Sequence, residues 1–192
     1  MTIVPRWEWR TFGGSFGPAE ERFAALTPEL VQESDETYVL STEGDASVKV
    51  RDELMDVKRL EMVNDDGLEQ WIPVLKEGFP LAEADAGTLF AALDVPAPPD
   101  GTITYDQFLA TVEATPELRS IGVHKRRARY TLDGCMAELS DIAADGHATR
   151  TIAIELEDPV LVIAAVRDLG LGDRANTCMA KGLKALVAFE GA

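Results

Sequence analysis

The chain has 192 residues, of which 46% are hydrophobic and 27% charged, a composition ordinary for a globular protein of one or two domains. Its 34 acidic and 18 basic residues give a formal net charge of -16, which argues against nucleic acid or an anionic membrane as the main partner. No apolar run reaches the roughly 20 residues of a membrane-spanning helix, and residues 1–10 lack the apolar stretch of a secretory signal.

Turn-forming residues divide the first half of the chain into short strands and helices. Residues 7–12 alternate between aromatic and charged side chains and end at Gly13-Gly14, which is typical of a strand. Short polar or glycine-containing loops between the next strands favour antiparallel hairpins. The expected strands are 7–12, 37–41, 47–51, 55–63 and 68–75, and the expected helices are 19–26, 82–93 and 104–112.

The second half returns to strands and closes with two helices. Turns at Asp133-Gly134 and Asp145-Gly146 join three further strands. These strands are 121–132, 135–142 and 148–156, and the helices are 159–169 and 175–189. About eight strands with few helices predict an α+β fold, in which one domain over residues 1–192 forms an antiparallel β-barrel with flanking helices.

One stretch of this acidic chain carries basic residues alone. Arg119, Lys125, Arg126, Arg127 and Arg129 lie in it with no acidic residue between them. Because the net charge disfavours binding to long polyanions, this cluster indicates a site for a compact, highly charged anion.

The charges also follow the alternation of strand side chains between the two faces of a sheet. Four pairs would each share a face: Glu8 with Arg10, Lys49 with Arg51, Lys125 with Arg127, and Glu155 with Glu157. Two interpretations fit this pattern: a sheet with one face in water, or a barrel with charges inside and helices outside. A charged interior needs counter-ions, which a polyphosphate would supply to the cations and a divalent metal to the carboxylates.

Taken in order, these motifs resemble those of the CYTH superfamily, the triphosphate tunnel metalloenzymes, which include thiamine triphosphatases, inorganic triphosphatases and one class of adenylate cyclases. The resemblance spans nearly the whole chain and rests on the order of its elements, none of which is specific alone. They are Arg6-Trp7-Glu8-Trp9-Arg10 in place of Glu-x-Glu-x-Lys, Lys49-Val50-Arg51, Lys58 or Arg59, the stretch from Lys125 to Arg129, Glu138 or Asp141, Glu155-Leu156-Glu157, and Lys181-Gly182-Leu183. The fold of that family, an eight-stranded antiparallel tunnel with flanking helices, agrees with the elements expected above.

The first motif departs from the family pattern. Arg6 stands where the family has its first Glu, and Arg10 stands where it has Lys. Arg10 can still bind a phosphate, and its planar guanidinium would do so bidentately, but Arg6 cannot bind a metal.

The resemblance implies a role for each inward-facing charge. Phosphate oxygens would be bound by Arg10, Lys49, Arg51, Lys58, Lys125 and Arg127. Mg²⁺ or Mn²⁺, hard cations that prefer oxygen ligands, would be bound by Glu8, Glu155 and Glu157.

Two further residues complete the implied site. Glu138 would contact the waters of the metal or act as a general base, with Asp141 as its rival of opposite strand parity. Lys181 would close one end of the tunnel over the terminal phosphate. At the adjacent pair Lys58 and Arg59, one side chain should face inward, and Lys58 is narrowly preferred.

The sequence therefore predicts a metal-dependent phosphohydrolase acting on inorganic triphosphate, short polyphosphate or a small organic triphosphate. Two alternatives stay open: a module that binds polyphosphate or a phosphorylated ligand without cleaving it, and an adenylate cyclase. Cys135 and Cys178 lie far apart in the sequence and in no metal-binding spacing. We therefore expect both to be reduced thiols with a packing role in a cytoplasmic protein.

Overall fold

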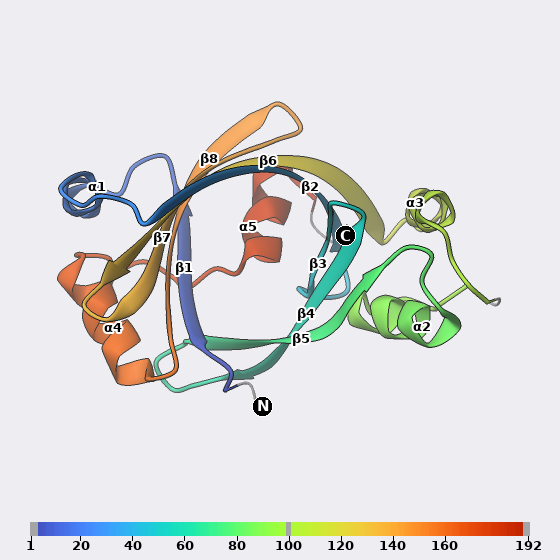
Figure 1. Ribbon diagram of the computed structural model, residues 1–192, viewed down its shortest axis with the longest axis horizontal. Coiled ribbons are helices and arrows are strands. Elements are labelled where there is room, and N and C mark those ends of the chain that lie inside the picture. Colours follow the sequence, from blue (N-terminus) through green and yellow to red (C-terminus); the bar gives the residue numbers. More distant parts are fainter. Residues whose placement is uncertain (1–3, 99–100, 190–192) are drawn as a thin grey trace.

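The computed structural model of the protein describes residues 4–98 and 101–189. Its strands are β1 (Trp7–Gly13), β2 (Leu30–Ser41), β3 (Ser47–Arg51), β4 (Leu54–Val63), β5 (Glu69–Gly78), β6 (Leu118–Leu132), β7 (Cys135–Ala144) and β8 (His147–Leu156). They form one antiparallel sheet that closes on itself in the order β1-β5-β4-β3-β2-β6-β7-β8 (Figure 1). This ring of strands confirms the fold class expected from the sequence.

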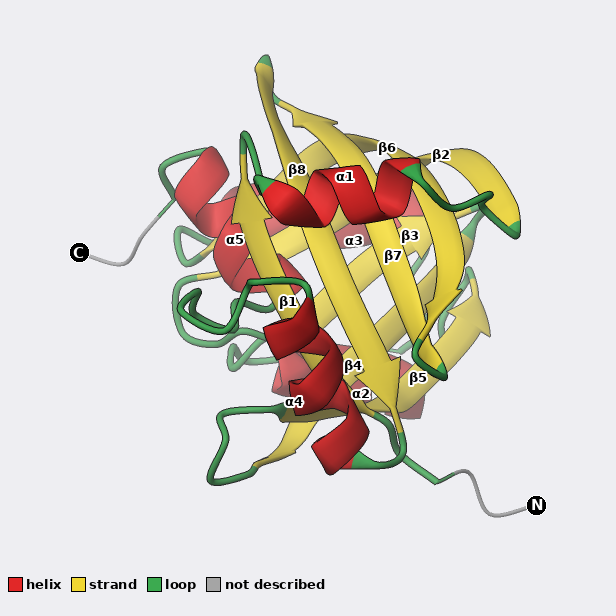
Figure 2. Ribbon diagram, turned by 90° about the vertical axis from the view of Figure 1, so that its left-hand side faces the viewer, coloured by secondary structure: helices red, strands yellow, loops and turns green. Residues whose placement is uncertain are grey.

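Helices cover the outside of the ring in two places and close one of its ends. They are α1 (Pro18–Ala24), α2 (Glu83–Ala92), α3 (Tyr105–Ala114), α4 (Pro159–Asp168) and α5 (Met179–Leu186). α1 and α4 lie on one side of the ring, α2 and α3 lie on the opposite side, and α5 sits at one end (Figures 1 and 2). Within the described ranges, no helix is both long and apolar enough to cross a membrane.

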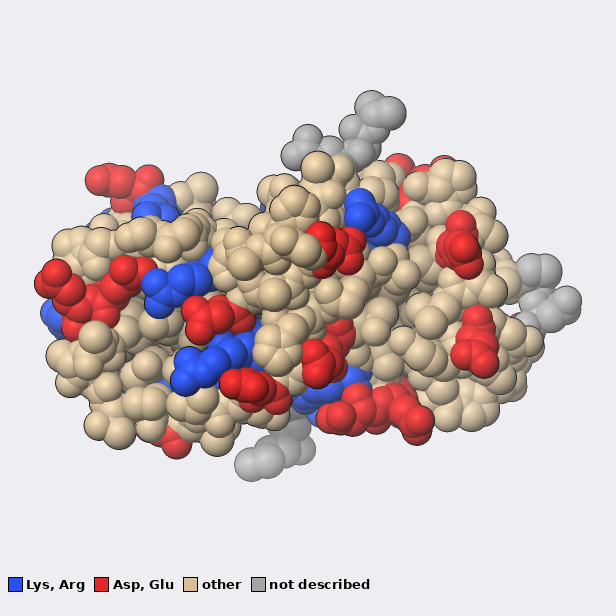
Figure 3. Space-filling model, turned by 90° about the horizontal axis from the view of Figure 1, so that it is seen from above, with Lys and Arg blue, Asp and Glu red and all other residues tan. Residues whose placement is uncertain are grey.

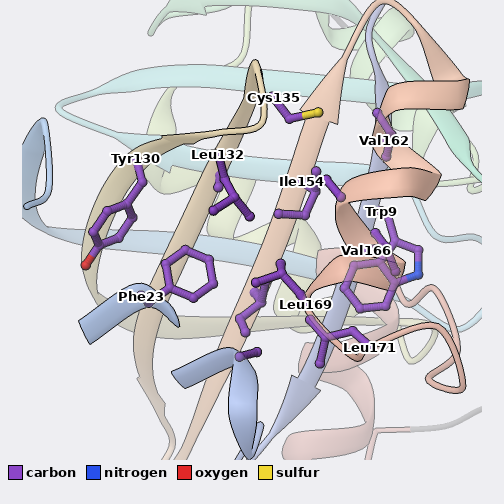
Figure 4. Close-up of a cluster of buried hydrophobic side chains, with 14 of the residues drawn as sticks. Trp9, Phe23, Tyr130, Leu132, Cys135, Ile154, Val162, Val166, Leu169 and Leu171 are labelled. Carbon is purple, nitrogen blue, oxygen red and sulfur yellow. The ribbon is translucent and has the colours of Figure 1, made fainter. Parts of the chain in front are cut away.

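Two apolar cores between the ring and its outer helices fix which face of each strand points outward. In the first core, Trp9 and Ile154 pack with Phe23 of α1 and Val162 of α4 (Figure 4). In the second core, valine and methionine side chains of β3 and β4 pack with α2 and α3. Burial of apolar surface stabilises this arrangement by about 25 cal/mol per Å². Because strand side chains alternate, the charged faces of the same strands must point into the ring.

A third apolar core fills one end of the ring, where α5 enters it. Met179 and Leu183 of α5 pack against inward-facing side chains, among them Tyr38 and Ile121. A Cβ atom added at Gly182 would lie 2.1 Å from the Phe12 ring, so only glycine lets the helix approach β1 this closely. The interior is therefore apolar and closed at the α5 end.

Several boundaries differ from those predicted by one to three residues, and two differ by four or more. β2 begins at Leu30 rather than at residue 37, because it pairs with β6 over its whole length although its first half is mostly exposed and shows no apolar alternation. The last helix begins at Met179 rather than at residue 175, because the preceding residues run along β1 instead of coiling. There the Thr177 N–H donates to the Arg10 carbonyl at 2.7 Å.

The seam between β1 and β5 is the weakest part of the ring, with only two residue pairs, Trp7 with Gln70 and Glu8 with Glu69. Beyond Glu8, the side chain of Asn176 replaces the missing strand partner. It accepts from the Arg10 N–H at 2.8 Å and donates to the carbonyls of Glu8 and Gly67. On the other side of the two pairs the ladder ends, the Gln70 side chain reaches across to donate from Nε2 to the Pro5 carbonyl at 3.2 Å, and the seam opens beyond it.

Candidate functional site

The polar part of the interior is a chamber of about 130 Å³ between α5 and the open seam, hereafter the chamber. Every one of the eight strands contributes at least one side chain to its wall. The side chains from the strands are those of Glu8, Arg10, Tyr38, Ser47, Lys49, Asp56, Lys58, Trp71, Lys125, Arg127, Glu138 and Glu155. The structure therefore gathers most of the residues that the sequence assigned to one site.

Three cations surround the carboxylate of Glu138. Lys125 Nζ lies 2.7 Å from Glu138 Oε1, Arg10 Nη1 lies 3.7 Å from the same oxygen, and Arg127 Nε lies 3.7 Å from Oε2. Burial alone would raise the pKa of Glu138, but Lys125 and then Arg10 outweigh it and lower the pKa to about 2. Glu138 is therefore ionised, and its charge holds the three cations in place.

Arg10 is the most connected of these cations. Its Nε donates to Glu8 Oε1 at 2.9 Å, and its Nη1 donates to Thr151 Oγ1 at 3.2 Å. Burial alone would lower the pKa of Arg10, but Glu8 and Glu138 raise it above its ordinary value. The guanidinium is therefore buried, charged and fixed in orientation before any ligand is present.

A second ion cluster links β2 and β3 through Glu36, a residue that the sequence analysis missed. Lys49 Nζ and Arg51 Nη1 each lie 3.4 Å from a Glu36 carboxylate oxygen. Burial alone would raise the pKa of Glu36, but Lys49 and Lys125 lower it below its usual value. The alternation of β2 could have identified it, since Glu36 shares a face with Tyr38, but the predicted strand began at residue 37 and left Glu36 out.

Two carboxylates form the acidic part of the chamber. Glu8 and Glu155 lie directly opposite each other on β1 and β8, and both line the chamber. Burial and then the charge of the nearby Glu8 both raise the pKa of Glu155. Arg6 Nη1 lies 3.9 Å from Glu155 Oε2 at the mouth, and Glu157 lies exposed beyond the end of β8.

These donors can be tested against a divalent metal. In residues 4–98 and 101–189, no group of three or more Asp, Glu, His or Cys side chains is placed to hold a metal ion. Mg²⁺, however, is usually held by one or two carboxylates together with the phosphates of a substrate. Glu8 and Glu155 fit a site of this kind, in which two carboxylates and the phosphate oxygens of a bound substrate would together be the ligands of the metal.

The structure distinguishes the two pairs of rival residues. Both side chains are exposed, but Lys58 lines the chamber and Arg59 does not. Glu138 lies inside, whereas Asp141 lies on the outer face, where it pairs with Arg150 at 3.2 Å and Arg126 at 3.7 Å. Basic and acidic side chains are interspersed across the outer surface in Figure 3.

Two predicted phosphate-binding residues lie at the edge of the site. Lys181 is half-exposed, and its Nζ lies 3.5 Å from Asp45 Oδ2. Arg51 reaches Glu36 but lines a different cavity of about 750 Å³, with Tyr105 and His124. Neither residue lines the chamber.

The N-terminus of α5 supplies a wall that the sequence analysis did not foresee. Cys178, Met179 and Ala180 line the chamber, and no side chain caps the first backbone N–H groups of the helix. Free N–H groups and the helix dipole both favour an anion at this position. Cys135 and Cys178 are free and buried, as expected of packing residues, and burial raises the pKa of Cys178 to about 11.

Comparison with known proteins identifies the fold. No protein-family model and no curated protein sequence matches the chain. Among solved structures, it is similar to the Hippeastrum protein HpAC1, described as revealing a dominant triphosphatase activity, with 13% identity over 97% of both chains and a TM-score of 0.51. It is also similar to a conserved hypothetical protein from Pyrococcus furiosus, with 12% identity over 88% of this chain and 94% of the other and a TM-score of 0.50. The chain has a CYTH-like fold, the triphosphate tunnel fold.

Proposed function

We propose that the protein is a metal-dependent phosphohydrolase that cleaves a phosphoanhydride bond of a triphosphate or short polyphosphate bound in the chamber. The observation that carries this proposal is the convergence of Arg10, Lys49, Lys58, Lys125 and Arg127 on the wall of one chamber, with Arg10 and Lys125 buried in it. Cations held in place in a site shielded from water bind a compact polyanion strongly, because they need not reorganise when it arrives.

The proposed roles follow from the position of each residue. Arg10, Lys125 and Arg127 would bind the phosphate oxygens deep in the chamber, and Lys49 and Lys58 would bind them from the opposite strands. The first N–H groups of α5 would stabilise the same negative charge. Lys181 and Arg51, which do not line the chamber, would contact only a longer phosphate chain.

Glu8 and Glu155 would hold Mg²⁺ or Mn²⁺, with Glu157 at the mouth as the remaining acidic residue of the implied set. When bound, the metal would supply additional positive charge to the phosphate chain. Arg6 supplies positive charge at the same mouth from the protein itself.

Glu138 is the proposed general base, and its three cations control when it can act. With a pKa of about 2 it is a poor proton acceptor in the free protein. A bound phosphate would draw Arg10, Lys125 and Arg127 away from it, which would raise its pKa. Binding would in this way prepare the carboxylate to accept a proton from the attacking water.

Phosphate release tests the proposal. Purified protein should release phosphate from tripolyphosphate with Mg²⁺ or Mn²⁺, and Lys49→Ala or Glu155→Gln should lower the rate at least about a hundredfold, as expected for removing a charged group from a preorganised site. Arg59→Ala, next to Lys58 but outside the chamber lining, is the matched control and should retain the rate. No turnover with either metal would contradict the proposal, and formation of cyclic AMP from ATP would point to an adenylate cyclase.

One observation favours a second candidate, a module that binds polyphosphate without cleaving it. Arg6 and Arg10 already pair with Glu155 and Glu8, at 3.9 and 2.9 Å, which leaves less need for a metal. Calorimetry would show this function as tight tripolyphosphate binding that does not change on addition of EDTA and is not followed by phosphate release. A cytoplasmic location stays a prediction for either function.

A further inference from the structure

Glu36 is a buried carboxylate to which the proposed function assigns no role. Its side chain is only 3% exposed, and it does not line the chamber. Its negative charge would repel a phosphate rather than bind it, and burying such a charge destabilises a protein unless cations compensate for it. A buried anion so close to an anion-binding chamber therefore needs an explanation.

Three donors from two strands hold this carboxylate. Lys49 Nζ on β3 lies 3.4 Å from Glu36 Oε2, and Arg51 Nη1 on the same strand lies 3.4 Å from Oε1. The Ser34 hydroxyl, two residues earlier on the same face of β2, donates to Oε1 at 3.3 Å. The carboxylate is therefore fixed at a point where β2 and β3 meet.

Only one of the two cations reaches the chamber. Lys49 lines it, whereas Arg51 lines the separate cavity of about 750 Å³. In the part of the chain that the structure describes, Glu36 is the only acidic residue that forms an ion pair with Lys49. The chamber cations of β1 and β6 share Glu138 instead. The contact of Glu36 with the chamber therefore runs through Lys49.

Lys49 needs such a partner because a lysine side chain is long and flexible. It lies opposite Tyr38 in the β2–β3 ladder, and its Nζ is 5.9 Å from the centroid of the Tyr38 ring. The ring limits the side chain on one side, and Glu36 determines the direction of the ammonium group. An ammonium group has three N–H donors, so Lys49 can keep its bond to Glu36 and donate to a phosphate oxygen as well.

On the basis of the proposed function, we infer that Glu36 is a positioning residue, which holds the ammonium group of Lys49 where the phosphate chain binds. Without Glu36, Lys49 would be a largely buried cation with no counter-ion and would turn toward water. A bound phosphate would then have to order a mobile lysine, and part of the benefit of a preorganised site would be lost. Glu36 itself touches no substrate.

Glu36→Gln distinguishes this role from that of a simple negative charge. If Glu36 positions Lys49, the variant should lower kcat/KM for tripolyphosphate with Mg²⁺ or Mn²⁺ about tenfold, the lower end of what losing an orienting partner costs in metal sites. If Glu36 only repels phosphate, its removal should raise kcat/KM. A rise or no change would overturn the inference.

Glu33→Gln is the matched control on the outer face of the same strand. Glu33 pairs there with Arg126 at 3.7 Å, and its side chain is 61% exposed. Because water screens this pair, the variant should keep kcat/KM within about twofold of wild type.

Double-mutant cycles show whether the effect passes through Lys49. In a Lys49→Ala background, Glu36→Gln should cause no further loss of kcat/KM, because the residue that it positions is absent. In an Arg51→Ala background, the loss of about tenfold should remain. A general loss of folded protein would instead lower kcat/KM in both backgrounds. If the loss persists beside Lys49→Ala or disappears beside Arg51→Ala, the inference is wrong.

A second variant covers the case in which Glu36→Gln does not fold. Glu36→Asp keeps the charge but shortens the side chain by one methylene group, which draws the carboxylate away from Lys49. It should lower kcat/KM in the same direction, and only when Lys49 is present. An unchanged kcat/KM in this variant would count against the inference.

Binding separates the failure of this inference from that of the proposed function. If the wild-type protein hydrolyses tripolyphosphate but the cycles give the opposite result, the phosphohydrolase stands and the inference falls. If the wild type releases no phosphate with either metal, the proposed function fails, and calorimetry with tripolyphosphate decides the inference. Glu36→Gln should then bind about tenfold more weakly than wild type, and should have no effect in the Lys49→Ala background. Equal or tighter binding by Glu36→Gln would overturn the inference.

Discussion

The two faces of β6 and β7 place the same kinds of charged side chain in opposite surroundings. On the inner face, Lys125 Nζ lies 2.7 Å from Glu138 Oε1, and their side chains are only 9% and 12% exposed. On the outer face, Arg126 Nη1 lies 3.7 Å from Asp141 Oδ2, and their side chains are 50% and 55% exposed. Lys125 and Arg126 are neighbours in the chain, and only the alternation of the strand separates them.

Water determines what each pair can do. On the outer face, water and salt screen the charges, so such a pair contributes little to stability. On the inner face, the charges are largely removed from water, so removing one partner destabilises the folded protein. The same charges are held in position, so an anion that enters the chamber binds to cations that are already oriented. Strand position rather than residue type therefore separates the functional cations from the solvated ones.

Removal of the buried carboxylate should give the largest effect and would break the inner cluster. Glu138→Gln leaves Arg10, Lys125 and Arg127 without their shared counter-ion, and we expect the free energy of unfolding to fall by about 3–5 kcal/mol. Asp141→Asn, its control on the outer face, should cost less than about 1 kcal/mol. Urea unfolding compares the two variants, and equal losses would remove the distinction between the faces.

The cost of Glu138→Gln should also depend on pH. The pKa of Glu138 is lowered from 4.5 to about 2 in the folded protein. A carboxyl group with a lowered folded-state pKa stabilises the fold fully above its unfolded pKa and loses that contribution as the pH falls toward its folded pKa. The difference in unfolding free energy between wild type and variant should therefore narrow from pH 4.5 to about pH 2, and a constant difference would count against this ion cluster.

The next largest effect concerns turnover and compares two adjacent cations. Lys125→Ala should lower kcat/KM for tripolyphosphate by about 10²–10³, the usual effect of removing one preorganised charge from a site. Arg126→Ala should leave kcat/KM within about twofold of wild type, since its side chain points to water. Steady-state phosphate release measures both, after circular dichroism has shown that both variants fold.

A smaller effect, on metal binding, is expected at the mouth of the chamber, where Arg6 lies between the buried inner face and the solvent. Arg6→Glu restores an acidic residue beside Glu155 and Glu8, and we expect Mn²⁺ to bind about tenfold more tightly, because affinity rises with the number of charged oxygen ligands. Calorimetric titration with Mn²⁺ measures the change. Arg6→Gln, which removes the cation without adding a ligand, is the control and should give a smaller gain.

The smallest effect should come from the outer pair itself. Arg126→Ala should lower the free energy of unfolding by roughly 0.2–1 kcal/mol at low salt, and the loss should disappear in about 1 M NaCl. The cost of Glu138→Gln should persist at the same salt concentration, because ions cannot screen a buried pair as well. Urea unfolding at the two salt concentrations would show whether this contrast exists.

Much of the site followed from local sequence alone. The parity of Glu8, Arg10, Lys125 and Arg127 was predicted, and the structure places all four on the chamber wall. Glu36 was missed because the first half of β2 shows no apolar alternation and is identified as a strand only by its pairing with β6. The wall that the first turn of α5 adds to the chamber and the opening of the β1–β5 seam could not be foreseen, because each requires segments far apart in the chain to lie together.

By itself, the sequence determined the order of the strands along the chain and which charges share a face, because the two-residue period of a strand is a local property. Tertiary structure alone decided that those faces point into a ring, that α5 closes one end, and that the seam between β1 and β5 opens beside Trp71. These features depend on the burial of apolar surface between distant elements, and local propensity does not encode it.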